Sequence, residues 1–272
     1  MSQTLLFLGA TGGVANACLT SALKSNQYKA IALVRTPEKL RKQLVDQQGL
    51  EENIVSSNLT IIQGNALDLS NVKRALLANI TEHGDIALPS MIISGLGGAP
   101  ALNLDIRHPL QIGKLDNPTI CEDAAKTLIT ALKEVYSERP SLSSRKPGVC
   151  FVSTTGISRG PEDVPFGMQF LYHQMLALPH ADKKKMETTF RDHMLQSEPV
   201  FASVTGIRPT LLKGTGALNE GAGIEKLRVG VESRPAAGFT VQRADVGAWM
   251  FENVVKESEG GRWRGEMVSL TA

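Results

Sequence analysis

The 272-residue sequence predicts a single α/β domain built on a doubly wound parallel sheet. Three observations predict this class. Short apolar runs alternate with amphipathic stretches, a glycine cluster follows the first run, and the composition is that of a soluble globular protein. About 42% of the residues are hydrophobic and 21% are charged, which is enough for a substantial core. A chain of this length fits one large α/β domain, and we expect no second independent domain.

Six short apolar runs are the predicted strands. They are residues 4–9, 28–35, 59–65, 91–97, 148–156 and 200–209. The predicted helices space apolar side chains by three or four, and they are residues 14–25, 37–48, 70–80 and 119–138. Strands that alternate with helices are typical of parallel βαβ units. Residues 99–118 carry no clear period, so we expect a long loop after the fourth strand.

Two stretches in the C-terminal half are expected to form a small substrate lobe. Residues 159–181 follow the fifth strand and are rich in Met, Phe and Leu, whereas residues 211–240 follow the sixth strand and are rich in glycine. Doubly wound folds bind their ligands at the carboxyl edge of the sheet, where both stretches begin. We therefore expect both to lie over a bound small-molecule substrate.

Charge and cysteine content exclude several classes of protein. The 29 Lys and Arg residues nearly balance 27 Asp and Glu residues, which gives no support for nucleic-acid binding. Cys18, Cys121 and Cys150 show neither zinc-ligand nor disulfide-framework spacing, and we assign no metal. The first apolar run is too short for a signal peptide or a membrane span. We expect a cytoplasmic protein without membrane partners, either a monomer or a weak homodimer.

The glycine cluster has the pattern of a dinucleotide-binding loop. Gly9, Gly12 and Ala15 stand at the spacing G-x-x-G-x-x-A, between a predicted strand and a predicted helix. The first glycine permits a tight turn, the second lets the backbone approach a pyrophosphate, and the small third residue lets helix and strand pack closely. The helix N-terminus also offers free N–H groups to the phosphates. The competing interpretation is a plain structural turn.

Arg35 directly follows the second predicted strand, where a dinucleotide fold meets the adenosine ribose. An acid at this place would bind the free 2′-hydroxyl of NAD, whereas an arginine can pair with the 2′-phosphate of NADP. No acid follows the strand before Glu38. The sequence therefore favours NADP over NAD, with a solvated Arg35 as the alternative.

These features resemble the atypical short-chain dehydrogenase/reductases. More narrowly, they resemble the NmrA-like or NAD(P)H-binding branch, which shares the Rossmann fold and includes oxidoreductase-like members common in fungi. The segments that carry the resemblance are GATGGVA (9–15), Arg35, QGNALDLSNVKRAL (63–76), DKKKMETTFRDH (182–193), GIRPTLL (206–212) and QRADVGAWM (242–250). They run from the first predicted strand nearly to the C-terminus.

The resemblance also implies which residues contact the cofactor. The residues implied to line its diphosphate and 2′-phosphate are Gly9, Thr11, Gly12, Val14 and Arg35. Asn65 and Ala66 are implied to lie near the adenine, Ser94 and Gly95 under the cofactor, and Ser153 and Pro209 close to the nicotinamide. Members of the branch often carry aspartate where this chain has Asn65.

The Tyr-x-x-x-Lys pair that serves proton transfer in many short-chain dehydrogenases is absent. Residues four places after Tyr28, Tyr136 and Tyr172 are Ala32, Pro140 and Leu176. Lys183 matches the family lysine, and the tyrosine position then falls on Pro179. The resemblance implies that Lys183 hydrogen-bonds the nicotinamide ribose, which needs no tyrosine. A solvated helix face is the alternative for this lysine, as it is for its two lysine neighbours.

The remaining candidate catalytic residues are Ser153, Tyr172 and His180. Ser153 could hydrogen-bond a substrate carbonyl, while Tyr172 or His180 could donate a proton, although each could equally be a packing or capping residue. We expect an NADP(H)-dependent oxidoreductase that reduces a carbonyl or a conjugated double bond of a small apolar metabolite. Two alternatives stay open. One is a redox-silent, NmrA-type regulator, which the missing Tyr-Lys pair favours, and the other is an isomerase or cyclase of a secondary-metabolite pathway.

Overall fold

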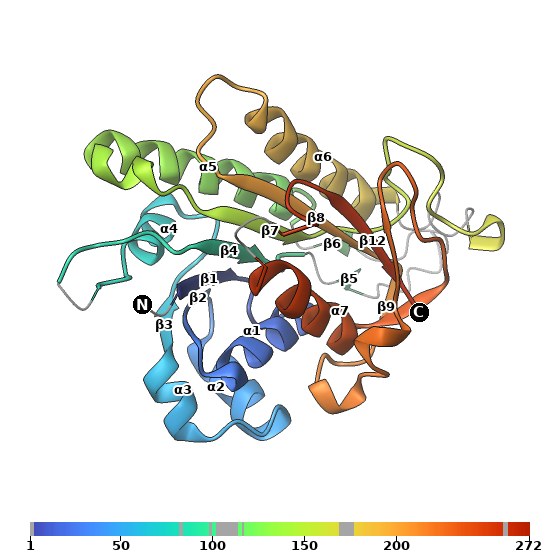
Figure 1. Cartoon of the computed structure of the whole chain (residues 1–272), viewed down its shortest axis with the longest axis horizontal. Helices are drawn as coiled ribbons and strands as arrows, with labels where there is room; N and C mark the ends of the chain where they lie inside the picture. The colour runs from blue at the N-terminus through green and yellow to red at the C-terminus, as the bar shows by residue number, and fades with distance from the viewer. Residues whose placement is uncertain are drawn as a thin grey trace.

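An eight-stranded sheet forms the centre of the computed structural model, which describes residues 3–81, 84–97, 100–101, 114–115, 117–168, 177–257 and 261–272 (Figure 1). Its strand order is β10-β12-β8-β7-β4-β1-β2-β3. The strands are β1 (Gln3–Leu8), β2 (Tyr28–Val34), β3 (Leu59–Gln63), β4 (Met91–Ser94), β7 (Gly148–Val152), β8 (Ser203–Pro209), β10 (Arg228–Val231) and β12 (Met267–Thr271). All neighbours pair in parallel except β10 and β12. The predicted doubly wound sheet is confirmed.

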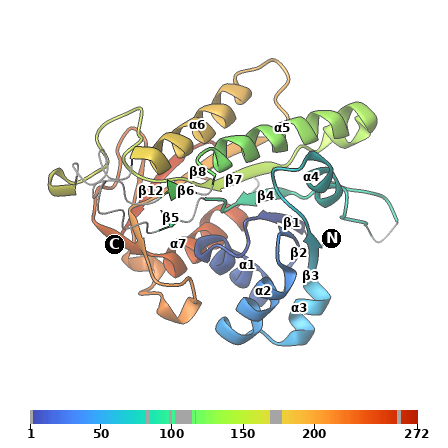
Figure 2. The same cartoon turned by 180° about the vertical axis from the view of Figure 1, so that it is seen from behind.

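Helices cover both faces of this sheet (Figures 1 and 2). One face carries α1 (Gly13–Ser25), α2 (Pro37–Lys42), α3 (Glu52–Asn58) and α7 (Arg243–Met250). The other face carries α4 (Leu69–Leu76), α5 (Ile120–Glu138) and α6 (Ala177–Met194). Single π-helical turns over Gln43–Gln47 and Phe251–Val255 extend α2 and α7. Short 3₁₀ turns span Pro140–Ser144, Phe166–Met168, Leu218–Glu220 and Ile224–Lys226.

The first strand, β1, shows why the sequences of the parallel strands are continuous apolar runs. Leu5 and Phe7 pack into the core under α1 and α7, whereas Leu6 and Leu8 pack into the core under α4, α5 and α6. All four side chains are at most 1% exposed. A parallel strand covered by helices on both faces has no solvent side, so its sequence does not alternate between apolar and polar residues.

The structure extends the predicted elements in the C-terminal half. β12 was not predicted, because its buried Ser269 and Thr271 interrupt the apolar run. Residues 211–240, predicted as a glycine-rich part of the substrate lobe, contain β9 (Leu211–Lys213), β10 and the start of β11 (Thr240–Gln242), and β9 pairs with β11. Residues 177–181 form the first part of α6. In the predicted loop 99–118, β5 (Pro100–Ala101) pairs with β6 (Lys114–Leu115).

The strand order places a topological switch point between β1 and β4. From β1 the chain proceeds outward to β2 and β3, and from β4 it proceeds in the opposite direction to β7 and β8. The loops that follow β1 and β4 therefore leave to different sides of the sheet, which opens a crevice at the carboxyl edge. Gly95, just after β4, donates its N–H to the carbonyl of Leu8 at 2.9 Å. This contact holds the two loops together at the edge.

Candidate active site at the carboxyl edge of the sheet

The glycine loop forms the predicted tight turn between β1 and α1. Gly9 has φ +77°, and a Cβ added to it would lie 2.9 Å from the backbone nitrogen of Leu96. Gly12 donates its N–H to the carbonyl of Gly9 at 2.9 Å and then starts the helix without a side-chain cap. The first N–H groups of α1 have no partner within the helix. They are donors available to an anion such as a diphosphate.

The third position of the motif also behaves as predicted. Ala15 faces Gly95, and a Cβ added to Gly95 would lie only 2.5 Å from the Ala15 methyl carbon. Two small residues thus let the start of α1 lie close against the end of β4. Val14, the second residue of the helix, and Ser94, the last residue of β4, are both buried.

Two glutamine side chains that the sequence analysis did not single out stabilise the glycine loop and the start of α1 by hydrogen bonds. The Gln43 side-chain amide donates to the carbonyl of Thr11 at 3.2 Å. Gln48 donates to both Asn16 Oδ1 and the carbonyl of Gly216 at 2.8 Å. The Gln48–Gly216 bond joins residues 168 positions apart, so no local pattern could predict it.

The predicted adenosine end lies beside the ends of β2 and β3. Arg35 is exposed directly after β2, and within the described part of the chain its guanidinium makes no hydrogen bond or ion pair. Asn65 is also exposed, and its side-chain oxygen accepts a hydrogen bond from Leu67 N at 3.1 Å. Ala66 is buried. The placement of Arg35 suits contact with a 2′-phosphate, whereas the Asn65 carboxamide oxygen is engaged in its own turn.

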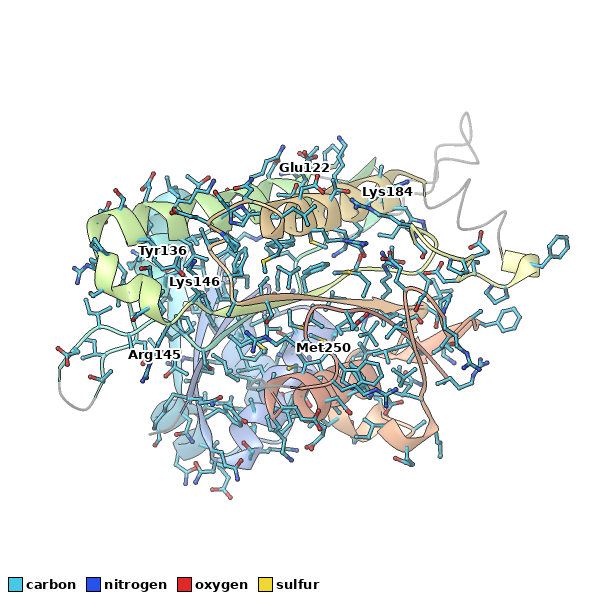
Figure 3. All side chains as sticks on the ribbon, turned by 45° about the horizontal axis from the view of Figure 1, so that its top comes forward. Glu122, Tyr136, Arg145, Lys146, Lys184 and Met250 are labelled. Atoms are coloured by element: carbon cyan, nitrogen blue, oxygen red, sulfur yellow. The ribbon has the colours of Figure 1, made fainter. Side chains whose placement is uncertain are left out.

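Lys183 differs from the two lysines that follow it. Its ammonium group donates to the carbonyls of Leu96 and Val152, both at 2.6 Å, and therefore bridges the ends of β4 and β7. Lys184 and Lys185 are exposed, and Lys184 projects from the outer side of α6 (Figure 3). The solvated-face interpretation is thus correct for two of the three lysines and wrong for Lys183.

Ser153 lies directly after β7 and is only 4% exposed. Its N–H donates to the carbonyl of Ile207 at 2.6 Å, yet no hydrogen-bonding group among the described residues reaches its Oγ. Pro209 ends β8 beside it and accepts a hydrogen bond from Thr155 N at 3.2 Å. Because buried polar atoms nearly always have partners, an orphaned hydroxyl at a ligand-binding edge is a candidate ligand contact.

Of the two candidate proton donors, the structure describes His180 but not Tyr172. His180 is buried, and its Nε2 lies 3.5 Å from Thr154 Oγ1. Tyr172 falls outside the described residues. Tyr136 donates to the carbonyl of Val200 at 2.9 Å, and burial raises its pKa above the ordinary value. A phenol held in that way is a packing residue rather than a catalytic one.

Asp182 is a site-supporting residue that the sequence analysis missed. Its carboxylate accepts hydrogen bonds from Cys121 N at 3.0 Å and Glu122 N at 2.9 Å, so it caps the N-terminus of α5 from helix α6. The neighbouring Lys183 is held at the sheet edge as a result. Cys121 donates its thiol to the carbonyl of Leu96, and burial raises the pKa of that thiol to about 11. This cysteine is therefore a structural thiol.

An ion cluster connects α6, β8 and the segment after β10. Arg208 on β8 donates to both carboxylate oxygens of Glu187 and to Glu232, which also pairs with Arg191. Glu232 accepts a further hydrogen bond from the backbone N–H of Arg159 at 3.3 Å. The cluster thereby ties together the two stretches that the sequence assigned to a substrate lobe.

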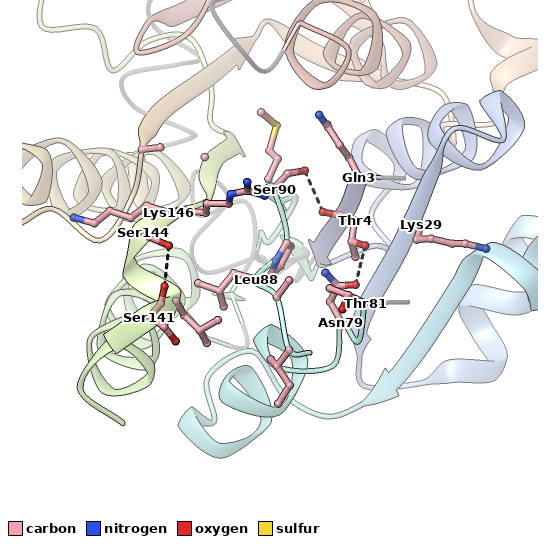
Figure 4. A pocket seen from close by; sticks show the side chains of 18 of the residues that line it. Gln3, Thr4, Lys29, Asn79, Thr81, Leu88, Ser90, Ser141, Ser144 and Lys146 are labelled. Atoms are coloured by element: carbon pink, nitrogen blue, oxygen red, sulfur yellow. Dashed lines mark hydrogen bonds between the residues drawn. The ribbon is translucent and has the colours of Figure 1, made fainter. Parts of the chain in front are cut away.

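A hollow lies at the opposite edge of the sheet. It has a volume of about 1030 Å³ and is lined by the amino ends of strands, with Gln3, Lys29 and Met91 among its residues (Figure 4). Doubly wound folds do not bind their cofactors at this edge. Among the described residues, no group of three or more His, Cys, Asp or Glu side chains could hold a metal ion. No described helix is long and apolar enough to span a membrane.

Comparisons with known proteins agree with this geometry. A family model described as NAD(P)H-binding matches residues 9–257. The reductase pytE of Aspergillus terreus is 41% identical over 271 residues, covering 98% of this chain and 97% of the relative. The oxidase pynE of Aspergillus niger is 38% identical over 286 residues and covers 98% of both chains.

Solved structures share the fold at low identity. A short-chain dehydrogenase/reductase from Veillonella parvula in complex with NADP has a TM-score of 0.66 at 13% identity, covering 100% of this chain and 95% of that chain. ChuY, an anaerobilin reductase from Escherichia coli O157:H7, has a TM-score of 0.59 at 20% identity, covering 98% and 96%. The family match and the two fungal relatives, which align over nearly their whole length, show what the chain is. It belongs to the NAD(P)H-binding family and is an NAD(P)-dependent oxidoreductase of the atypical short-chain dehydrogenase/reductase group.

Proposed function

We propose that this protein is an NADP(H)-dependent reductase that reduces a carbonyl group or a conjugated double bond of a small apolar molecule. The observation that carries the proposal is the meeting of Lys183 and Ser153 at the carboxyl edge of β7. The lysine ammonium bridges two strand ends, and the serine hydroxyl is buried without a partner. The names of the two fungal relatives, a reductase and an oxidase, support redox chemistry at this edge.

The residues present fit a dinucleotide with a 2′-phosphate. The turn from Gly9 to Gly12 and the uncapped start of α1 would hold the diphosphate through backbone N–H groups. Arg35, exposed after β2, would pair with the 2′-phosphate. When bound, the reduced cofactor supplies the hydride. This arrangement supports NADP(H) over NAD(H), because the site offers a cation and no carboxylate directly after the strand.

Ser153 and Lys183 would act on either side of the nicotinamide. An ammonium group has three N–H donors, and Lys183 uses two of them on backbone carbonyls, so one remains for the ribose. Ser153 would donate to the substrate oxygen and stabilise the negative charge that develops there. Of the two predicted proton donors, His180 is buried within reach of the same loop, whereas Tyr172 is outside the described residues.

Exposed aromatic side chains support an apolar substrate. Phe166, in the stretch 159–181, is 91% exposed, and Phe239, in the stretch 211–240, is 58% exposed. Large exposed apolar side chains in both stretches of the proposed lobe are suited to cover an apolar ligand.

The test is NADPH oxidation with quinones, enones and aromatic ketones, together with NADPH binding. Ser153→Ala should lower kcat by about 100-fold, as loss of an oxyanion donor does, and leave the Kd for NADPH unchanged. Lys183→Met should raise that Kd, whereas its exposed neighbour in Lys184→Met should behave as the unmodified protein. NADPH binding without turnover of any compound would overturn the proposal and favour a redox-silent regulator.

A further inference from the structure

Four buried side-chain atoms in the described part of the chain have no hydrogen-bond partner. They are Gln43 Oε1, Ser153 Oγ, Asp163 Oδ2 and Gln242 Oε1. Of these four side chains, only that of Asp163 is an ionisable carboxyl. Its side chain is 1% exposed, and nothing in the sequence analysis had singled it out.

A hydrogen bond connects the Asp163 side chain to the loop segment that begins with Ser153. Its Oδ1 accepts a hydrogen bond from Gly156 N at 2.7 Å. The preceding residue, Thr155, donates its N–H to the carbonyl of Pro209 at the end of β8. The carboxyl group is therefore attached just beyond the ends of β7 and β8. Both Ser153 Oγ and Asp163 Oδ2 lie in this loop, and both are unpartnered.

Opposing influences act on the pKa of the Asp163 carboxyl, and their balance raises it. Burial raises the pKa of its carboxyl above the ordinary value, and the neighbouring Glu162 acts in the same direction. The hydrogen bond from Gly156 and the Arg208 guanidinium act against this shift. The positive charge of Arg208 is, however, already matched by two carboxylates, Glu187 and Glu232. A carboxylic acid has one O–H donor, and Oδ2 offers it no acceptor within the described protein.

We infer that Asp163 is the proton donor of the reduction and that its Oδ2–H is presented to the substrate oxygen beside Ser153. This inference rests on the proposed reductase function. As the acceptor carbon gains the hydride, the electron pair of the C=O bond moves to oxygen, and that oxygen takes the proton from Oδ2. For an enone the same proton goes to the enolate oxygen. The Asp163 carboxylate then regains a proton from water, so each cycle consumes one hydride and one proton.

The first test does not depend on turnover. Infrared difference spectra at neutral pH should show a protonated-carboxyl stretch that is lost in Asp163→Asn and retained in Asp192→Asn, a matched change at an aspartate with a 60% exposed side chain. Asparagine can still accept the Gly156 hydrogen bond, so the loop should be preserved. Should that variant not fold, the pH titration of the Asp163 carboxyl carbon by NMR in the unmodified protein decides. A carboxyl that is ionised at neutral pH overturns the inference.

The second test is kinetic. Asp163→Asn should lower kcat by about 100-fold or more, the usual contribution of a general acid, with the Kd for NADPH unchanged. Its rate should also lose the decline toward high pH that deprotonation of Asp163 causes in the unmodified protein. If Asp163→Asn keeps the full rate while His180→Ala loses it, the proton comes from His180. That result would refute the donor role of Asp163 but leave the reductase function intact. An unmodified protein without turnover would refute the reductase function and the donor role together.

Discussion

The buried ion pair between β8 and α6 gives a quantitative prediction for stability. Arg208 is 1% exposed and Glu187 is 3% exposed. The arginine donates to Glu187 Oε1 at 2.9 Å and Oε2 at 2.6 Å, and to Glu232 Oε1 at 2.8 Å. Removing the arginine would leave Glu187 as a buried carboxylate with neither water nor a cation to stabilise it.

Arg208→Met should therefore lower the free energy of unfolding by about 3–5 kcal/mol, the usual cost of breaking a buried ion pair on one side. That is a large part of the roughly 5–15 kcal/mol by which a domain is stable. Most of the lost stability should come from the unpaired charge of Glu187. Glu232 is less affected, because its side chain is 19% exposed and its carboxylate keeps the ion pair with Arg191 at 2.8 Å. The double variant Arg208→Met/Glu187→Met removes both buried charges and should recover most of the lost stability.

The assay is equilibrium urea unfolding, followed by tryptophan fluorescence and by circular dichroism in parallel. The midpoint should fall in Arg208→Met with little change in the slope m, since the surface exposed on unfolding is nearly the same. Arg264→Met is the matched control, because Arg264 is exposed and its one hydrogen bond to a described residue goes to the carbonyl of Ala202 at 3.1 Å. Its effect should stay within about 0.5 kcal/mol. A loss below about 1 kcal/mol in Arg208→Met, or a double variant no more stable than the single one, would refute the reasoning.

Three further predictions concern the cofactor and acid stability. Arg35→Asp should weaken NADPH binding but spare NADH, with a smaller loss at high salt, while Arg41→Asp on the neighbouring helix should do neither. Fluorescence titrations that give the unmodified protein equal affinities for the two cofactors would contradict this. Gly95→Val should raise the Kd for NADPH and lower the urea midpoint, because even a Cβ at this position would lie 2.5 Å from the Ala15 methyl. Unchanged binding would show that the close approach is dispensable. Although burial disfavours its charge, hydrogen bonds from neighbouring arginines lower the pKa of Glu232 from 4.5 to about 2. Its contribution to stability should be complete above about pH 4.5 and be lost as the pH falls toward 2, so Glu232→Gln should flatten the acid side of the urea-midpoint profile.

The sequence by itself determined the parts of this protein that depend on neighbours along the chain. The turn after β1 needs glycine at position 9 and a small residue at position 15, and both requirements appear in seven consecutive residues. The apolar runs of the parallel strands and the helical periods between them were readable for the same reason. Together they predicted the doubly wound sheet, its carboxyl edge and the dinucleotide-binding loop.

Only the tertiary structure decided which polar side chains are gathered at that edge. The family resemblance pointed to Lys183, but the sequence left a solvated helix face open as it did for the two lysines beside it. Only the structure shows that Lys183 reaches the carbonyls of Leu96 and Val152, which are 87 and 31 residues away. Asp163 lies in a stretch without periodicity, and its burial depends on strands β7 and β8 beside it. Hydrogen bonds, burial and pKa shifts of this kind arise from residues distant in sequence, and a pattern of residue types along the chain does not encode which of them meet.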